Sequence, residues 1–186
     1  MRVIAGTARS INLITPKGFD TRPTTDKYKE TLFNCLQSYI GNSVFVDLYS
    51  GSGAIGIEAL SRGAKRAYFV ENSTDAHKCI IENLKKTHLE DKASVFKEDV
   101  LFFIKNRLKE VPDVVFLDPP FKDHLETKVI PLLLEKNLIS EDTIIVVECD
   151  NQADFGFIDA LNLEIIKIKD YKNNKHVFIR RKEEEV

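Results

Sequence analysis

The sequence has no tryptophan, only three cysteines and no long apolar run, and the missing apolar run excludes a membrane-spanning helix. The longest uninterrupted aliphatic stretch is about Ile144 to Val147, whereas a membrane-spanning helix needs about 20 apolar residues. The first residues, Met-Arg-Val-Ile-Ala-Gly, lack the apolar segment of a secretory signal. We therefore expect a soluble, cytoplasmic protein.

The few cysteines are widely spaced and form no Cys-x-x-Cys pair. This spacing argues against a structural zinc site and for reduced thiols, packed as small core residues at Cys35, Cys79 and Cys149. Four histidines also lack metal-ligand spacing, and we expect them on helix faces or in loops: His77, His88, His124 and His176. The sequence thus predicts no metal site.

An excess of one charge is lacking as well, because 27 basic residues stand against 29 acidic ones. The distribution is nevertheless uneven. Residues 1–40 carry six basic and three acidic groups, residues 41–166 carry 14 and 22, and residues 167–186 carry seven and four. The basic ends are compatible with a nucleic-acid partner, although chance explains the distribution equally well before any motif is considered.

What the sequence does contain is an alternation of short apolar runs and longer helical patterns. With 186 residues and 43% hydrophobic residues, the chain is long enough for one domain with a substantial core. We expect strands over residues 44–49, 67–70, 93–96, 114–117 and 143–147, and helices over 54–62, 74–88, 100–109 and 125–136. The runs are almost entirely apolar, which is typical of parallel strands buried on both faces. This order predicts a doubly wound, mostly parallel α/β sheet.

Both ends depart from this alternation. Strand-like runs over 163–169 and 176–180 flank an Asn-rich loop at 172–175 and predict an antiparallel C-terminal hairpin. At the other end, residues 3–5 and 13–15 can pair as a small hairpin, followed by a helix over 26–39 with Thr24 or Thr25 as N-cap. We expect a single domain over 1–186, with an N-terminal extension over 1–40 and a catalytic core over 41–186.

A glycine-rich segment follows the first long strand. Gly51, Gly53 and Gly56 match the pattern G-x-G-x-x-G, and Glu71 lies 20 residues after Gly51 at the end of the next strand. Such a loop lets the backbone approach a ligand, and the carboxylate can accept hydrogen bonds from ribose hydroxyls. These residues alone are compatible with NAD, FAD or S-adenosylmethionine (SAM).

Three features favour SAM over a dinucleotide. Asp47 precedes the loop, where it can face the ammonium group of a methionine moiety but would repel a pyrophosphate. The antiparallel terminal hairpin differs from the all-parallel dinucleotide fold, and few residues remain for a separate substrate domain. Asp99, before Val100, can accept a hydrogen bond from the adenine amino group, or cap the following helix, or do both.

The segment Asp118-Pro119-Pro120-Phe121 is the most specific signal in the chain. It follows an apolar strand, at the edge where open α/β sheets bind ligands. An exocyclic nucleobase amine is a poor nucleophile, but Asp118 and the Pro119 carbonyl can accept its two N–H bonds and direct its lone pair at a methyl sulfonium. The prolines fix that carbonyl, and Phe121 offers a stacking face for the base.

Together the two motifs resemble those of class I, amino-directed SAM-dependent methyltransferases. The chain is more specifically similar to the RsmD family, the 16S ribosomal RNA guanine-N2 methyltransferases. The segments that carry this resemblance span nearly the whole chain: Ile4-Ala5-Gly6, Arg22-Pro23-Thr24-Thr25-Asp26, Glu30 to Asn34, Gly51 to Ala54 and Glu58 to Ala64.

The resemblance implies a Rossmann-like fold and methylation of the N2 amine of a guanine, position 966 in the usual 16S numbering, in a small-subunit loop. It assigns SAM contacts to Asp47, Ser50, Gly51, Gly53, Glu71, Asp99 and Val100, the target amine to Asp118 through Phe121, and RNA contacts to Arg9, Arg22, Thr24, Thr25 and Lys27. The implied partner is 16S rRNA, a 30S subunit or its assembly intermediate, bound by a monomer. Where the family usually has a basic Arg-Gly-Arg-like arm, only Arg9 matches, which weakens the expected N-terminal RNA contact.

Other functions remain open at this point. The Asp-Pro-Pro-Phe segment is also compatible with adenine-N6 methylation in DNA or RNA and with methylation of a protein glutamine amide. The glycine loop alone is compatible with an NAD-binding oxidoreductase, and the basic ends with a non-catalytic RNA-binding module.

Overall fold

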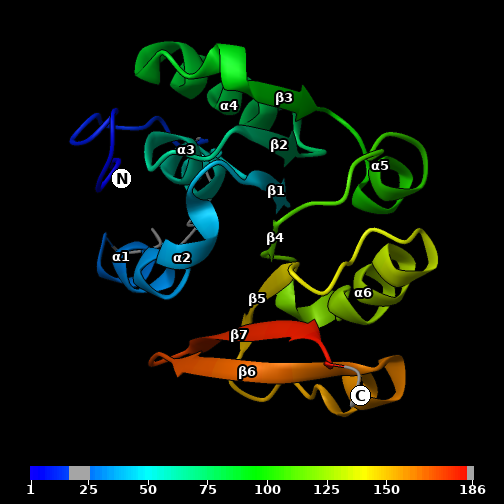
Figure 1. Ribbon diagram of the computed structural model, residues 1–186. Coiled ribbons are helices and arrows are strands. Elements are labelled where there is room, and N and C mark those ends of the chain that lie inside the picture. Colours follow the sequence, from blue (N-terminus) through cyan, green and yellow to red (C-terminus); the bar gives the residue numbers. More distant parts are fainter. Residues whose placement is uncertain (17–25, 184–186) are drawn as a thin grey trace.

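The computed structural model describes residues 1–16 and 26–183, and within them seven strands form one sheet in the order β3-β2-β1-β4-β5-β7-β6 (Figure 1). The strands are β1 (Val44–Leu48), β2 (Arg66–Val70), β3 (Ala93–Phe96), β4 (Val114–Leu117), β5 (Ile144–Asp150), β6 (Leu163–Asp170) and β7 (Asn174–Arg181). Strands β1 to β5 pair in parallel, and β7 runs antiparallel between β5 and β6. The expected mostly parallel sheet with a C-terminal antiparallel hairpin is confirmed.

Helices cover both faces of the sheet. The helices are α1 (Asp26–Cys35), α2 (Gln37–Ile40), α3 (Ala54–Ser61), α4 (Thr74–Thr87), α5 (Val100–Asn106) and α6 (Glu126–Glu135), with short helices η1 (Glu90–Lys92), η2 (Phe121–Asp123) and η3 (Gly156–Leu161). One core cluster joins α1 to α4 and the N-terminal segment to the sheet, and a second joins α5, α6 and η3 to the opposite face. Figure 1 shows α1 to α4 on one side of the sheet and α5 and α6 on the other.

The central strands are buried because both of their faces are covered by helices. Every residue of β1 and β4 is buried, as their continuous apolar sequence predicts. β3 lies at the sheet edge and is only partly buried, so the expectation of a strand buried on both faces is wrong there. The boundaries also shift: α5 ends at Asn106 instead of Lys109, β5 continues to Asp150, and β7 begins at Asn174.

The N-terminal extension differs most from expectation. The expected small hairpin between residues 3–5 and 13–15 forms with a shifted register: an antiparallel bridge joins Arg2 to Asn12, the Val3 amide donates to the Ile11 carbonyl at 3.0 Å, and the Leu13 amide donates to the Met1 carbonyl at 2.9 Å. The expected helix over 26–39 is interrupted at Leu36, between α1 and α2. The proposed N-caps Thr24 and Thr25 lie outside the described residues.

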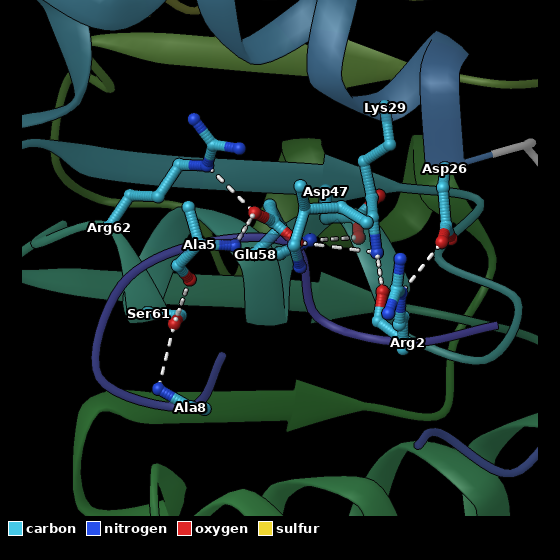
Figure 2. Close-up of polar contacts among 11 residues, drawn as sticks. Arg2, Ala5, Ala8, Asp26, Lys29, Asp47, Glu58, Ser61 and Arg62 are labelled. Atoms are coloured by element: carbon cyan, nitrogen blue, oxygen red, sulfur yellow. Dashed lines mark hydrogen bonds and ion pairs between the residues drawn. The ribbon is translucent and has the colours of Figure 1, made fainter. Parts of the chain in front are cut away.

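Beyond this pairing with the second segment, the first residues also bind to α3. The carboxylate of Glu58 accepts hydrogen bonds from the backbone amides of Ile4 and Ala5, at 2.8 and 3.0 Å (Figure 2). It also pairs with Lys29 of α1 at 3.3 Å and with Arg62 at 2.7 Å. The side chains of Glu58 and Lys29 are fully buried, so each charge needs the other to offset the loss of hydration. Glu58 therefore joins α3, α1 and the N-terminal segment.

Candidate active site

Acidic side chains gather at the carboxyl ends of the parallel strands. Asp47 is the penultimate residue of β1, and Glu71 directly follows β2. Asp118 directly follows β4, and Glu148 lies in β5 just beyond the residues that pair with β4. Because these strands are adjacent and parallel, their carboxyl ends share one edge of the sheet, where ligands bind in open α/β folds. This edge carries a concentration of negative charge suited to a cationic ligand.

Asp47 is held in a buried position beside the start of α3. Its Oδ2 accepts a hydrogen bond from the Gly56 amide at 2.9 Å, and the residue is 2% exposed. Burial raises the pKa of the Asp47 carboxyl to about 7; the Gly56 hydrogen bond opposes the shift and the charge of Glu71 adds to it. A cation bound next to Asp47 would restore the charged form.

The glycine loop connects β1 to α3 through backbone conformations that favour glycine. Gly51 and Gly53 have φ of +54° and +79°, and a Cβ added to Gly51 would meet no atom within 4 Å. The open space at Gly51 lets a ligand approach the backbone. Gly56 is different, because its added Cβ would lie 2.3 Å from Cε1 of Phe69. Gly56 thus serves tight packing of α3 on β2.

Two predicted cofactor residues also order the loop. Glu71 accepts hydrogen bonds from the amides of Gly51 at 2.8 Å and Ser73 at 2.7 Å. The buried Ser50 hydroxyl donates to the Asp47 carbonyl at 2.6 Å and accepts from the Val70 amide at 2.9 Å. Glu71 keeps lone pairs for ribose hydroxyls, whereas the Ser50 side chain joins β1 to β2.

Asp99 is exposed and caps α5, since its Oδ1 accepts a hydrogen bond from the Phe102 amide at 3.0 Å. The capping role is confirmed, and the second carboxylate oxygen has no such bond to the helix. Val100 is buried in the core behind it. Contact of these two residues with an adenine ring stays a prediction.

The Asp-Pro-Pro-Phe segment lies directly beside the end of β1. The Asp118 amide donates to the Leu48 carbonyl at 3.4 Å, which extends the pairing of β4 with β1 by one residue. The pKa of the Asp118 carboxyl is raised well above its ordinary value, first by burial and then by the charges of Glu148 and Asp47. Pro119 is buried, Pro120 is exposed, and the half-buried Phe121 begins η2.

The structure separates the predicted RNA-binding residues. Arg9 is exposed in a turn beside Ser61, at the end of α3 opposite to the glycine loop. Lys27 is exposed in the first turn of α1. The remaining three, Arg22, Thr24 and Thr25, lie outside the described residues.

The described residues on either side of positions 17–25 lie near the carboxyl edge. The buried Asn83 amide donates to the carbonyls of Ile14, at 2.8 Å, and Ser52 of the glycine loop, at 2.9 Å. On the other flank, the rings of Tyr28 and Tyr171 lie 4.2 Å apart, and Tyr171 contacts His176 near the end of β5. Ile14 and Tyr28 therefore approach the candidate site from two sides.

Glu148 and His176 are site residues that the sequence analysis missed. Glu148 Oε2 lies 3.1 Å from His176 Nε2, and Glu148 Oε1 accepts from Asn174 Nδ2 at 2.6 Å. His176 is fully buried in β7, so its expected place on a helix face or in a loop is wrong. A signal was present: Glu148 follows the apolar run 144–147 just as Asp118 follows 114–117.

The residues present fit SAM as the bound group. An open backbone at Gly51, a carboxyl at Asp47 whose charge a cation would stabilise, and an acid after β2 suit its methionine and ribose parts. Among the described residues, no group of acidic, histidine or cysteine side chains is arranged to hold a metal ion. Likewise, none of the helices in this part of the chain is long and apolar enough to cross a membrane. The fold and site define a class I, SAM-dependent methyltransferase.

Comparison with known proteins narrows this class. The chain belongs to the family described as Conserved hypothetical protein 95, whose family model matches residues 1–180. Ribosomal RNA small subunit methyltransferase D of Haemophilus influenzae is 37% identical over 171 residues, which cover 91% of this chain and 88% of that protein. A putative rRNA methyltransferase of Bacillus subtilis, YlbH, is 36% identical over 156 residues, 83% of this chain and 85% of that protein.

Solved structures agree with this family assignment. A putative methyltransferase of Escherichia coli superposes with a TM-score of 0.84 at 30% identity, covering 98% of each chain. A putative methylase of H. influenzae gives a TM-score of 0.81 at 33% identity, covering 98% of this chain and 99% of that one. The resemblance drawn from the motifs is confirmed, and the enzyme uses SAM as its methyl donor.

Proposed function

We propose that this enzyme transfers the methyl group of SAM to the exocyclic N2 amine of a guanine in 16S rRNA of the small ribosomal subunit. The observation that carries the proposal is the position of Asp118, which follows β4 directly beside the end of β1, where Asp47 and the glycine loop lie. A base amine at Asp118 is then next to the cofactor site. The relatives named ribosomal RNA small subunit methyltransferase D support the substrate class.

When bound, SAM supplies an electrophilic methyl group on a sulfonium. The task of the protein is to orient the amine, whose lone pair is otherwise delocalised into the base. The Asp118 carboxylate and the Pro119 carbonyl accept its N–H bonds, and Phe121 stacks on the ring. Holding the nitrogen in line with the methyl group provides much of the rate enhancement.

Cofactor binding falls to the residues around the glycine loop. Asp47 pairs with the methionine ammonium, and Glu71 accepts hydrogen bonds from the ribose hydroxyls. Asp99 accepts from the adenine amine while its other oxygen caps α5, and Val100 contacts the ring. Gly51 and Gly53 let the backbone approach the ligand, and Ser50 holds the loop against β2.

The N-terminal extension, residues 1–40, contacts the RNA in this proposal. Lys27 at the start of α1 directly precedes Tyr28, whose ring contacts Tyr171, and the described flanks of the block with Arg22, Thr24 and Thr25 approach the carboxyl edge. Arg9, at the far end of α3, makes an outlying phosphate contact. The target guanine is flipped towards Phe121, which costs less in a loop than in a duplex.

Labelled SAM incubated with 30S particles from a strain that lacks the modification tests this function. We expect label in 16S rRNA and N2-methylguanosine after nucleoside analysis. Label in N6-methyladenosine or in protein would contradict the guanine assignment. Calorimetry with SAM and with NAD is a second check, because tight binding of NAD without SAM would contradict the cofactor assignment.

A further inference from the structure

A row of polar side chains crosses one face of the sheet at the carboxyl edge. Asp47, Asp118, Glu148 and His176 lie on or directly after the adjacent strands β1, β4, β5 and β7. Side chains alternate between the two faces of a strand. Each of the four lies two residues from a member of the core cluster on the face that α1 and α3 cover, namely Phe45, Phe116, Val146 and Phe178. The acidic row therefore continues past Asp118 to Glu148.

Asp118 and Glu148 are neighbours within this row. Leu117 pairs with Val147 in the parallel register, so Asp118 and Glu148 occupy the next position along the two strands. Adjacent strands lie about 4.8 Å apart, and the two carboxyl groups are close enough that the charge of Glu148 acts on Asp118. The site thus presents two adjacent carboxyl groups to a bound ligand.

Glu148 is fixed in place but keeps acceptor capacity. Its two oxygens each have one protein donor, Asn174 Nδ2 at 2.6 Å and His176 Nε2 at 3.1 Å. The hydroxyl of Tyr171 lies 3.2 Å from His176 Nδ1, so a neutral imidazole can accept from Tyr171 and donate to Glu148. Each carboxylate oxygen has a second lone pair, and 12% of the Glu148 side chain is exposed. A rigid acceptor with a free lone pair therefore lies beside Asp118.

Guanine has the edge that two adjacent acceptors recognise. Its N1–H and its N2 amine are neighbouring donors, whereas adenine has an acceptor at N1 beside its amine. A carboxylate facing N1 therefore binds guanine and repels adenine. We propose that Glu148 accepts the N1–H of the target guanine while Asp118 accepts from its N2 amine, which makes Glu148 a specificity-determining residue. This inference rests on the proposed function.

His176 and Tyr171 act through Glu148 and are positioning residues in this account. Tyr171 also contacts Tyr28 of α1, so the chain of contacts from Glu148 ends on the N-terminal extension. Loss of the His176 bond should loosen Glu148 without touching the base directly. We expect His176→Phe to weaken the preference for guanine less than a change of Glu148 itself.

The test replaces the target guanine of the 16S rRNA by 2-aminopurine in a reconstituted small-subunit particle. This base keeps the N2 amine but has an acceptor at N1. The unaltered enzyme should methylate it about 10- to 100-fold less efficiently than guanine, because the lone pair at N1 then faces a carboxylate oxygen with no proton between them. In Glu148→Gln the side-chain amide can donate to N1, so the ratio should fall to within about threefold of unity.

The matched control is Glu164→Gln, which alters an acid of β6 that pairs with Arg180 outside the row and should keep the full preference. Unchanged SAM affinity in calorimetry shows that both variants are folded. Equal methylation of the two bases by the unaltered enzyme would overturn the inference and needs no variant. A guanine preference unchanged in Glu148→Gln would also overturn it. No transfer to guanine N2 by the unaltered enzyme would instead contradict the proposed function.

Discussion

At the scale of single residues, the proposed role of Asp47 in cofactor binding requires a charge that its burial disfavours. Its pKa is about 7 in the folded protein, against an ordinary value of 3.8. The folded state therefore holds the proton more tightly than the unfolded state between these two values. As the pH rises from about 4 to 7, the free energy of unfolding falls, because the buried carboxyl loses its proton.

Replacement of this carboxyl by an amide should stabilise the protein. In Asp47→Asn at pH 8, we expect the free energy of unfolding to rise by about 2–4 kcal/mol, since the ionisation cost disappears. The new amide oxygen can still accept the Gly56 hydrogen bond. Urea unfolding measures the effect, with Asp142→Asn, an exposed loop residue, as the neutral control. A less stable Asp47→Asn protein at pH 8 would contradict this account.

The same residue predicts how SAM binding depends on pH. In the proposed function only the charged Asp47 pairs with the methionine ammonium, so the affinity should be constant above pH 7. Below pH 7 it should fall by about tenfold per unit, as protons compete with the ligand. Calorimetry between pH 5.5 and 8.5 measures this dependence. A dependence that persists unchanged in Asp47→Asn would assign the titration to another group.

At the scale of elements, docking of the N-terminal segment on α3 depends on Gly6. This residue has a φ of +83°, and a Cβ added there would lie 1.8 Å from the backbone carbonyl oxygen of Ser61. Gly6→Ala should cost about 2 kcal/mol or more, because neither backbone can yield without breaking neighbouring hydrogen bonds. Gly41→Ala is the matched control, since its Cβ meets nothing within 4 Å. Equal melting temperatures for the two variants would contradict the docking.

The predictability of each element follows from where its hydrogen bonds go. Strands β1 and β4 bond within the sheet and are buried, so their apolar sequences predict them. The N-terminal segment bonds to Glu58, more than 50 residues away in sequence, and no local pattern indicates such a partner. The pairing of the two N-terminal segments was therefore predictable, but their docking on α3 was not.

The predictability of the site residues also depends on whether their partners are local in the sequence. Asp47, the glycines and Asp118 stand in local motifs, and the sequence placed them together because parallel strands share an edge. Glu148 and His176 meet only because β7 inserts between β5 and β6. Their pairing depends on the register of an antiparallel strand, which no spacing in the sequence specifies.

At the scale of the whole molecule, charge is divided between an acidic site and basic ends. In the proposed function the acids of the site face a cationic cofactor and a base amine, so a net charge of −2 does not oppose RNA binding. Binding of the small subunit should weaken with salt, but with a shallow slope because few phosphates are neutralised.

A substitution of Lys27 tests whether the basic N-terminal region binds the RNA. Lys27→Glu should weaken binding of 30S particles about 3- to 10-fold and reduce the salt slope, while SAM affinity stays unchanged. Lys65→Glu is the matched control, because Lys65 is exposed before β2, at the opposite edge of the sheet. Filter binding at several salt concentrations measures both variants. Equal losses in the two would mean that general charge, and not the position of α1, governs RNA binding.

The central claim, that Asp118 directs a guanine amine at the cofactor, is tested most directly by comparing the unaltered enzyme with Asp118→Ala in a single labelled transfer assay on 30S particles. The account predicts N2-methylguanosine in 16S rRNA from the unaltered enzyme and a loss of at least about 10³-fold in Asp118→Ala, with SAM affinity within about threefold. Retained transfer by Asp118→Ala, or loss of SAM binding together with activity, would contradict it.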